Sequence, residues 1–154
     1  SLRGMGTTAT VLKILEGHAY VAHVGDSRCY LLRCGFIYQI TNDHSLVAHL
    51  VERGQITAEE ARSDPRRNVV TRSIGVTAEI EVDVQRFADI MVPGSTLLLC
   101  SDGLHGVITD GEIASFLAMG ELDQAGQDLI DAANDMGGPD NITVVLARRS
   151  VNGA

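Results

Sequence analysis

The sequence predicts a single α+β domain built from layers of sheet and helix. Its 154 residues, 45% of them hydrophobic, are enough for one domain with a core of its own. Strand-like stretches with alternating apolar residues come first, and stretches with apolar residues at helical spacing follow them. Runs of strands followed by helices are typical of α+β domains. We expect one domain over residues 1–149 and a tail over residues 150–154.

The first four strands are predicted to form an antiparallel β-meander at residues 8–15, 19–24, 29–32 and 36–40. Turns are expected at Glu16-Gly17 and Cys34-Gly35, because glycine tolerates the positive φ of a tight turn. The pattern then changes to a polar helical insertion at residues 45–68.

Two short helices are expected within this insertion. Apolar residues repeat at helical spacing from Leu46 and stop at Gly54, which favours the end of a helix. Thr57 and Glu60 have the spacing of a capping box, and the second helix should end before Pro65.

The rest of the chain alternates strands and helices. Strands are predicted at residues 80–84 and 97–100, separated by a turn at Pro93-Gly94. A capping box of Thr109 and Glu112 opens one helix, and residues 123–136 form another. The last strand, residues 142–146, is apolar throughout and is therefore expected to be central in its sheet.

The net charge of −8, from 20 acidic and 12 basic residues, argues against a nucleic acid or an acidic membrane as partner. No stretch approaches the roughly 20 apolar residues that span a bilayer, and the first residues lack the apolar core of a signal peptide. We expect a cytoplasmic protein with reduced Cys29, Cys34 and Cys100. The chain starts without Met and enters strand-like sequence almost at once, which suggests that upstream residues are missing.

Two aspartates are the first candidates for chemistry. Asp102 follows the apolar run 97–100, and Asp140 precedes the apolar run 142–146. If these strands pair antiparallel, the end of one meets the start of the other and both carboxylates converge. Paired carboxylates suit Mg²⁺ or Mn²⁺, which prefer oxygen ligands. The alternative is that both belong to ordinary turns, where aspartate bonds its own backbone.

Other polar residues have competing interpretations. Asp26, after another apolar strand, is either a third ligand or part of a tight hairpin turn. His44 precedes a helix that Asp43 or Ser45 could cap, and His105 lies either in the site or in a solvated loop. The basic residues that could meet an acidic substrate are Arg66, Arg67 and Arg72.

Six motifs occur in an order that resembles one enzyme family: Gly4-Met5-Gly6-Thr7-Thr8, Val24-Gly25-Asp26-Ser27-Arg28, Asp43-His44-Ser45-Leu46-Val47, Asn68-Val69-Val70-Thr71-Arg72, Leu98-Leu99-Cys100-Ser101-Asp102-Gly103-Leu104 and Gly137-Gly138-Pro139-Asp140-Asn141-Ile142-Thr143-Val144-Val145. The series resembles the C-terminal part of a metal-dependent protein Ser/Thr phosphatase of the type 2C family, in its bacterial form. The resemblance covers essentially the whole chain.

The resemblance implies two stacked antiparallel β-sheets flanked by helices, an α-β-β-α sandwich whose N-terminal part is missing here. It implies two Mn²⁺ or Mg²⁺ ions with Asp102 and Asp140 among their ligands, Gly103 and Asn141 beside them, and Asp26 at a third, weaker metal. Residues 45–68 correspond to a flap beside the site. In the family, water bridging the metals attacks phosphoserine or phosphothreonine of a protein substrate, and two cations favour this chemistry.

Two departures from the family pattern limit what the chain can do alone. The family's N-terminal section, with a phosphate-binding arginine and further metal ligands, is absent, so the chain holds about half of the site. Gly106 stands where many relatives have an aspartate, which puts a third metal there in doubt.

Three functions follow as hypotheses. The first is a protein phosphatase of which this chain is the C-terminal portion, inactive alone and able to associate with its own N-terminal segment or with itself. The second is a non-catalytic binding or regulatory module, and the third a phosphatase for one phosphoserine partner in a bacterial switch. Retention of both Asp102 and Asp140 favours an enzyme over a module.

Overall fold

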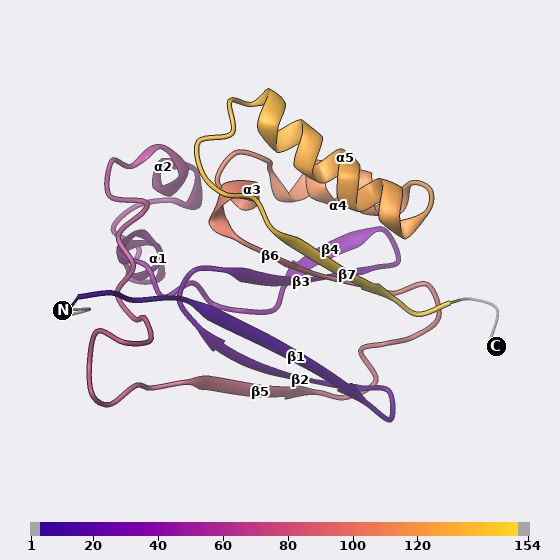
Figure 1. Cartoon of the computed structure of the whole chain (residues 1–154), viewed down its shortest axis with the longest axis horizontal. Helices are drawn as coiled ribbons and strands as arrows, with labels where there is room; N and C mark the ends of the chain where they lie inside the picture. Colours follow the sequence, from indigo (N-terminus) through magenta and orange to yellow (C-terminus); the bar gives the residue numbers. More distant parts are fainter. Residues whose placement is uncertain (1–3, 151–154) are drawn as a thin grey trace.

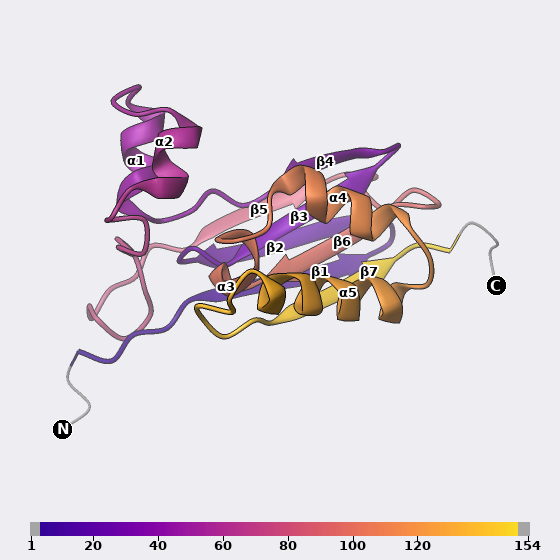
Figure 2. The ribbon, with the colours of Figure 1, turned by 90° about the horizontal axis from the view of Figure 1, so that it is seen from above.

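Two antiparallel sheets lie face to face, with helices over one outer face and a helical lobe at one end (Figures 1 and 2). The computed structural model describes residues 4–150. The first sheet has the order β1 (Ala9–Leu15), β2 (His18–Val24), β5 (Asp83–Phe87). The second has the order β4 (Phe36–Gln39), β3 (Arg28–Arg33), β6 (Thr96–Cys100), β7 (Val144–Arg148). The predicted fold class, α+β with two stacked sheets, is confirmed.

Strands β3 and β6 have apolar interiors, and both faces of each strand are covered. Tyr30 and Leu98 point toward the helices, whereas Cys29 and Leu97 point toward the other sheet. All four side chains are fully buried. Alternating side chains therefore contribute to two cores, one on each face of the same sheet.

The predicted β-meander is wrong, because β2 and β3 belong to different sheets. The chain crosses between the sheets at residues 25–27, where Gly25 has φ +112°. A Cβ at Gly25 would lie 2.3 Å from Cγ2 of Thr8, so only glycine fits this crossing. The alternative of a tight hairpin at Asp26 is excluded by the same topology.

The two hairpin turns predicted from sequence, at Glu16-Gly17 and Cys34-Gly35, are confirmed. Glu16 and Gly17 have φ of 52° and 80°, and Cys34 and Gly35 have the same two values. Two consecutive residues with positive φ are typical of the turns that match the twist of a hairpin. The thiol of Cys34 is exposed on its turn, whereas Cys29 and Cys100 are buried, and all three are free.

Helices α4 (Asp110–Ala118) and α5 (Leu122–Asp135) cover the four-stranded sheet (Figure 2). The predicted capping box is present, with the Thr109 side chain accepting from the backbone N–H of Glu112. The buried Leu117 and Leu129 pack on the sheet. No helix within residues 4–150 is long and apolar enough to cross a membrane.

The helical insertion, which we call the flap, comprises residues 45–68 and stands apart from the sandwich (Figure 2). It contains α1 (Leu46–Glu52) and α2 (Ala58–Ser63), and Ser45 and Thr57 cap these helices through their hydroxyls. The two ends of the flap lie side by side. They are joined by a hydrogen bond in which the backbone N–H of Leu46 donates to the carbonyl of Val69 over 2.9 Å.

Three details differ from the predicted elements. Strand β5 begins at Asp83, three residues later than expected. Its pairing with β2 begins there, with Asp83 opposite His23. Within residues 4–150, β7 is the outermost strand of its sheet rather than a central one, and Val145 is 56% exposed. A one-turn helix, α3 (Asp102–His105), follows β6 and carries the first candidate ligand.

The outer face of the three-stranded sheet carries an exposed apolar row among the described residues. Val11, Ala22 and Val84 stand opposite one another on β1, β2 and β5. Val11 is 59% exposed and Val84 is 71% exposed. An apolar row of this kind marks a surface suited to contact with another segment or chain.

Candidate metal centre

The end of β6 meets the start of β7, as the sequence predicts. The two strands are antiparallel, with Cys100 opposite Val144, and the N–H of Ser101 donates to the carbonyl of Thr143 over 3.1 Å. Asp102 and Asp140 therefore lie at one edge of the four-stranded sheet and line the same cleft.

The hydroxyl of Ser101 joins the two acidic loops. It donates to the carbonyl of Asn141 over 2.9 Å and accepts from the N–H of Thr143 over 2.9 Å. Because the hydroxyl is used between the loops, Ser101 makes no side-chain cap on α3. Serine at this position thus sets where Asp102 sits relative to the Asp140 loop.

Gly103 allows the loop that contains Asp102 and the loop that contains Asp140 to lie closer together than they could if residue 103 had a side chain. A Cβ at Gly103 would lie 2.4 Å from the carbonyl oxygen of Asn141. Gly103 is buried, and its neighbour Asp102 is the first residue of α3. The close approach of the two acidic loops therefore depends on the backbones of Gly103 and Asn141.

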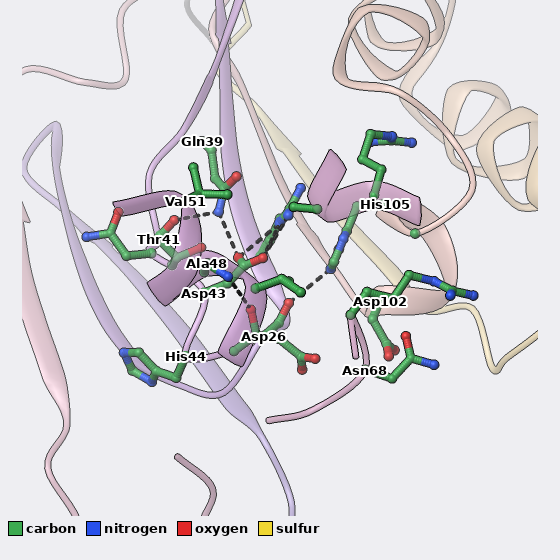
Figure 3. Close-up of a pocket in the computed structure, with 18 of the residues that line it drawn as sticks. Asp26, Gln39, Thr41, Asp43, His44, Ala48, Val51, Asn68, Asp102 and His105 are labelled. Carbon is green, nitrogen blue, oxygen red and sulfur yellow. Dashed lines mark hydrogen bonds and ion pairs between the residues drawn. The ribbon is translucent and has the colours of Figure 1, made fainter. Parts of the chain in front are cut away.

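Asp26 joins this edge from the crossing between the sheets, and His105 fixes its backbone. The Nε2–H of His105 donates to the carbonyl of Asp26 over 2.9 Å (Figure 3). Burial lowers the pKa of His105 to about 4, so the ring is neutral at neutral pH. His105 is only 8% exposed, which excludes the solvated-loop alternative.

The carboxylate of Asp102 is close enough to those of Asp26 and Asp140 for their charges to oppose one another. Burial raises the pKa of Asp26, and the charge of Asp102 raises it further. The pKa of Asp102 is raised by burial and then by the charge of Asp140. Among the ion pairs of residues 4–150, none of the three carboxylates has an arginine, lysine or histidine partner within 4.0 Å. A hard divalent cation is the partner that such a donor set fits.

The described residues supply only part of a ligand set. Within residues 4–150, no group of three or more His, Cys, Asp and Glu side chains is placed to hold a metal ion. Carboxylate oxygens combined with water are the ligands that Mg²⁺ and Mn²⁺ accept. Asp26, Asp102 and Asp140 would thus each contribute to a site that needs further donors.

A cleft of about 890 Å³ lies between these carboxylates and the flap (Figure 3). Arg62 and Arg67 line it from the flap. Arg66 is held locally by Asp64 at 2.8 Å, and Arg72 is bound to Asp83 at 2.7 Å. Arg66 and Arg72 are thus each engaged in an ion pair. Arg67, the third arginine proposed from the sequence, takes part in neither of these two pairs and lines the cleft.

An arginine that the sequence did not single out joins two of the motifs. The Nε of Arg28 donates to Oδ1 of Asp43 over 2.9 Å, and its Nη2 donates to Oδ2 over 2.7 Å. Burial alone would lower the pKa of Arg28, but the bonds to Asp43 outweigh it and the net shift is upward. No spacing rule links residues 28 and 43, because the fold brings them together.

His44 is not placed as a metal ligand. Ser45, not Asp43, caps the following helix by accepting from the N–H of Ala48, as one of the two alternatives predicted. Both ring nitrogens of His44 already have partners, at Gly25 and Asp83.

We expect Asp102→Asn to stabilise the metal-free chain at neutral pH. The folded state raises the pKa of Asp102, so its charge opposes folding above that pKa and ceases to do so once the carboxyl is protonated. The gain in melting temperature should therefore be present at neutral pH and shrink as the pH falls to about 3. Thermal melts in EDTA measure it. A variant that melts lower than the parent at neutral pH would contradict the electrostatic account.

The family model described as "PP2C: Protein phosphatase 2C" matches residues 3–142. The chain belongs to the protein phosphatase 2C family. A putative protein phosphatase 2C-type of Streptococcus pyogenes is 45% identical over 145 residues, 94% of this chain and 58% of the relative. The Listeria innocua serine/threonine phosphatase stp is 40% identical over 151 residues, 97% of this chain and 59% of the relative.

Solved structures of the family agree with the fold. The Mycobacterium tuberculosis serine/threonine phosphatase PstP/Ppp superposes with a TM-score of 0.90 at 41% identity, covering 97% of this chain and 62% of that one. The catalytic domain of PstP in complex with two manganese ions gives a TM-score of 0.83 at 39% identity, covering 94% and 59%. The chain thus spans about three fifths of the length of these relatives.

Proposed function

We propose that this chain is part of a metal-dependent phosphatase that hydrolyses phosphoserine and phosphothreonine in proteins. The observation that carries the proposal is the set of three aspartates without cationic partners, placed at one end of the sandwich beside an open cleft. Membership of the protein phosphatase 2C family and the names of the relatives support this activity.

Each side chain has a proposed role. Asp102 and Asp140 would bind Mn²⁺ or Mg²⁺ together with donors from outside the described residues, and Asp26 would bind a third ion. Two such ions lower the pKa of water and neutralise phosphoryl oxygens. Gly106 supplies no side chain to a third ion, so Asp26 and Asp102 would carry that task within this chain. Arg62 and Arg67 line the same cleft and would attract an anionic phosphoprotein.

A comparison of this chain with the complete gene product tests the proposal. We expect the complete product to release phosphate from a phosphothreonine peptide in Mn²⁺ and not in EDTA. This chain alone should bind Mn²⁺ weakly and release no phosphate, because it holds only part of the ligand set.

Light scattering on the chain would test self-association through the exposed apolar row of β1, β2 and β5. Metal-dependent turnover by neither protein would instead favour a non-catalytic module.

We expect the flap to act on protein substrates more than on the chemical step. Replacing residues 45–68 with a short linker should raise KM for a phosphopeptide while leaving hydrolysis of a small aryl phosphate within about twofold, since loops beside a site contact substrates selectively. Steady-state kinetics on both substrates measure this difference. Equal losses on the two substrates would mean that the flap supports the sandwich instead.

A further inference from the structure

His44 is a buried histidine at the base of the flap, and both nitrogens of its ring have polar partners. Its Nδ1 accepts a hydrogen bond from the backbone N–H of Gly25 over 3.0 Å. A backbone N–H can only donate, so Nδ1 is an acceptor and the ring proton lies on Nε2. Nε2 lies 3.1 Å from Oδ2 of Asp83, to which it donates, and also 3.1 Å from Nη1 of Arg72, which donates to the same carboxylate.

The Nδ1 end holds the peptide that precedes Asp26. His44 and Gly25 exchange two hydrogen bonds, since the N–H of His44 also donates to the carbonyl of Gly25 over 2.7 Å. Gly25 lies close to Thr8, where a side chain would clash, and its φ of +112° favours glycine. The orientation of Asp26 relative to Asp102 thus depends on His44 as well as on the bond from His105.

The Nε2 end of the ring holds the segment that follows the flap, residues 69–83, which we call the flap's return segment. Asp83, the first residue of β5, accepts from His44 and from Nη1 of Arg72, the latter over 2.7 Å. The bonds from His44 and Arg72 outweigh partial burial and keep the pKa of Asp83 below its usual range. The carbonyl of His44 also accepts from the N–H of Thr71 over 2.8 Å.

His44 packs against a second buried histidine, His23. The side chain of His44 is 8% exposed, and the ring of His23 lies with its centroid 4.9 Å away. His23 is itself bonded to Thr10 and to the carbonyl of Asn42. Burial, and then the neighbouring His44, lower the pKa of His23. The two buried rings therefore lie against each other next to residue 45, where the flap begins.

We propose that His44 is a positioning residue with two separable tasks. Its Nδ1 holds Asp26 in place for metal binding, and its Nε2, through Asp83 and Arg72, holds the flap's return segment in place for binding a phosphoprotein. The metal and substrate parts of this inference rest on the proposed function, whereas the two hydrogen bonds do not.

Two substitutions separate the two ends of the ring. In His44→Asn, the amide oxygen can occupy the place of Nδ1 and still accept from Gly25, but nothing reaches Asp83. In His44→Gln, the longer amide reaches toward Asp83, and the acceptor for Gly25 is lost. His18→Asn, at the start of β2, is the matched control because its histidine lies outside the cleft.

The bonds themselves are tested first on this chain by NMR. We expect a scalar coupling across the hydrogen bond between the Gly25 amide nitrogen and the His44 ring nitrogen in the parent. Hydrogen exchange at Gly25 should be slow in the parent and in His44→Asn and faster in His44→Gln. Hydrogen exchange at Thr71 should be faster in His44→Asn than in the parent, because the segment that contains Thr71 is no longer held through Asp83. These readouts do not require phosphatase activity, so they stand even if the proposed function fails.

The complete gene product then tests the two tasks. In His44→Gln we expect the Mn²⁺ concentration for half-maximal aryl phosphate hydrolysis to rise roughly fivefold, the effect of one lost hydrogen bond. In His44→Asn that concentration should stay within about twofold, while KM for a phosphopeptide rises roughly fivefold. His18→Asn should match the parent. If the two variants change the same parameters by equal factors, or if Gly25 exchanges alike in both, the division of tasks is overturned.

Discussion

Asp140→Asn is expected to lower phosphopeptide hydrolysis by the complete gene product by about 10²-fold or more, because a neutral amide replaces a ligand charge that serves the transition state. Asp102→Asn should have a loss of the same order. Neither side chain belongs to a buried apolar core, so the loss should occur without unfolding.

Asp89→Asn is the control for this experiment. Asp89 is exposed, lies outside the cleft and has φ 51°, a conformation that asparagine also accepts. Phosphate release in Mn²⁺ measures all three variants, and circular dichroism checks that they fold. Rates near that of the parent in both Asp102→Asn and Asp140→Asn would remove these residues from the metal site.

Gly103→Ala is expected to destabilise the chain and to weaken metal binding together. The new methyl group would overlap the carbonyl oxygen of Asn141, which belongs to backbone and cannot rotate away. The Asp140 loop must therefore move, and overpacking of this kind costs about 1–3 kcal/mol. Urea denaturation measures the free energy of unfolding, and calorimetric titration of the complete gene product measures the affinity for Mn²⁺.

Gly111→Ala is the control for Gly103→Ala. Gly111 lies in α4, and a Cβ there would meet nothing within 4 Å. Gly111→Ala should stabilise the chain by about 0.4–1 kcal/mol, because alanine loses less conformational freedom on folding. If Gly103→Ala behaves like Gly111→Ala, the close contact between the two acidic loops is not what sets the site.

The elements with local signals were predictable from the sequence. Capping boxes at Thr57 and Thr109 and the tight turn at Glu16-Gly17 are set by residues a few positions apart. The convergence of Asp102 and Asp140 was also predictable, because it needs only that two neighbouring apolar strands pair antiparallel.

The crossing between sheets was not predictable from the same signals. Val24-Gly25-Asp26 has the composition of a turn, and the choice between a hairpin and a crossing depends on which strand pairs with β3. On the side where β2 would pair in a meander, the partner of β3 is β6, about seventy residues along the chain, so no local pattern specifies it. The partners of His44 and His105 are likewise set by tertiary contacts.

The joined ends of the flap have a consequence for how such a protein diversifies. A segment that leaves and re-enters a fold at adjacent backbone positions, as at Leu46 and Val69, can change in length or content without moving the strands on either side. Selection can then vary the helices of the flap while the aspartates stay in place. We expect natural sequences with this sandwich to differ most, by insertion and deletion, between positions 46 and 69.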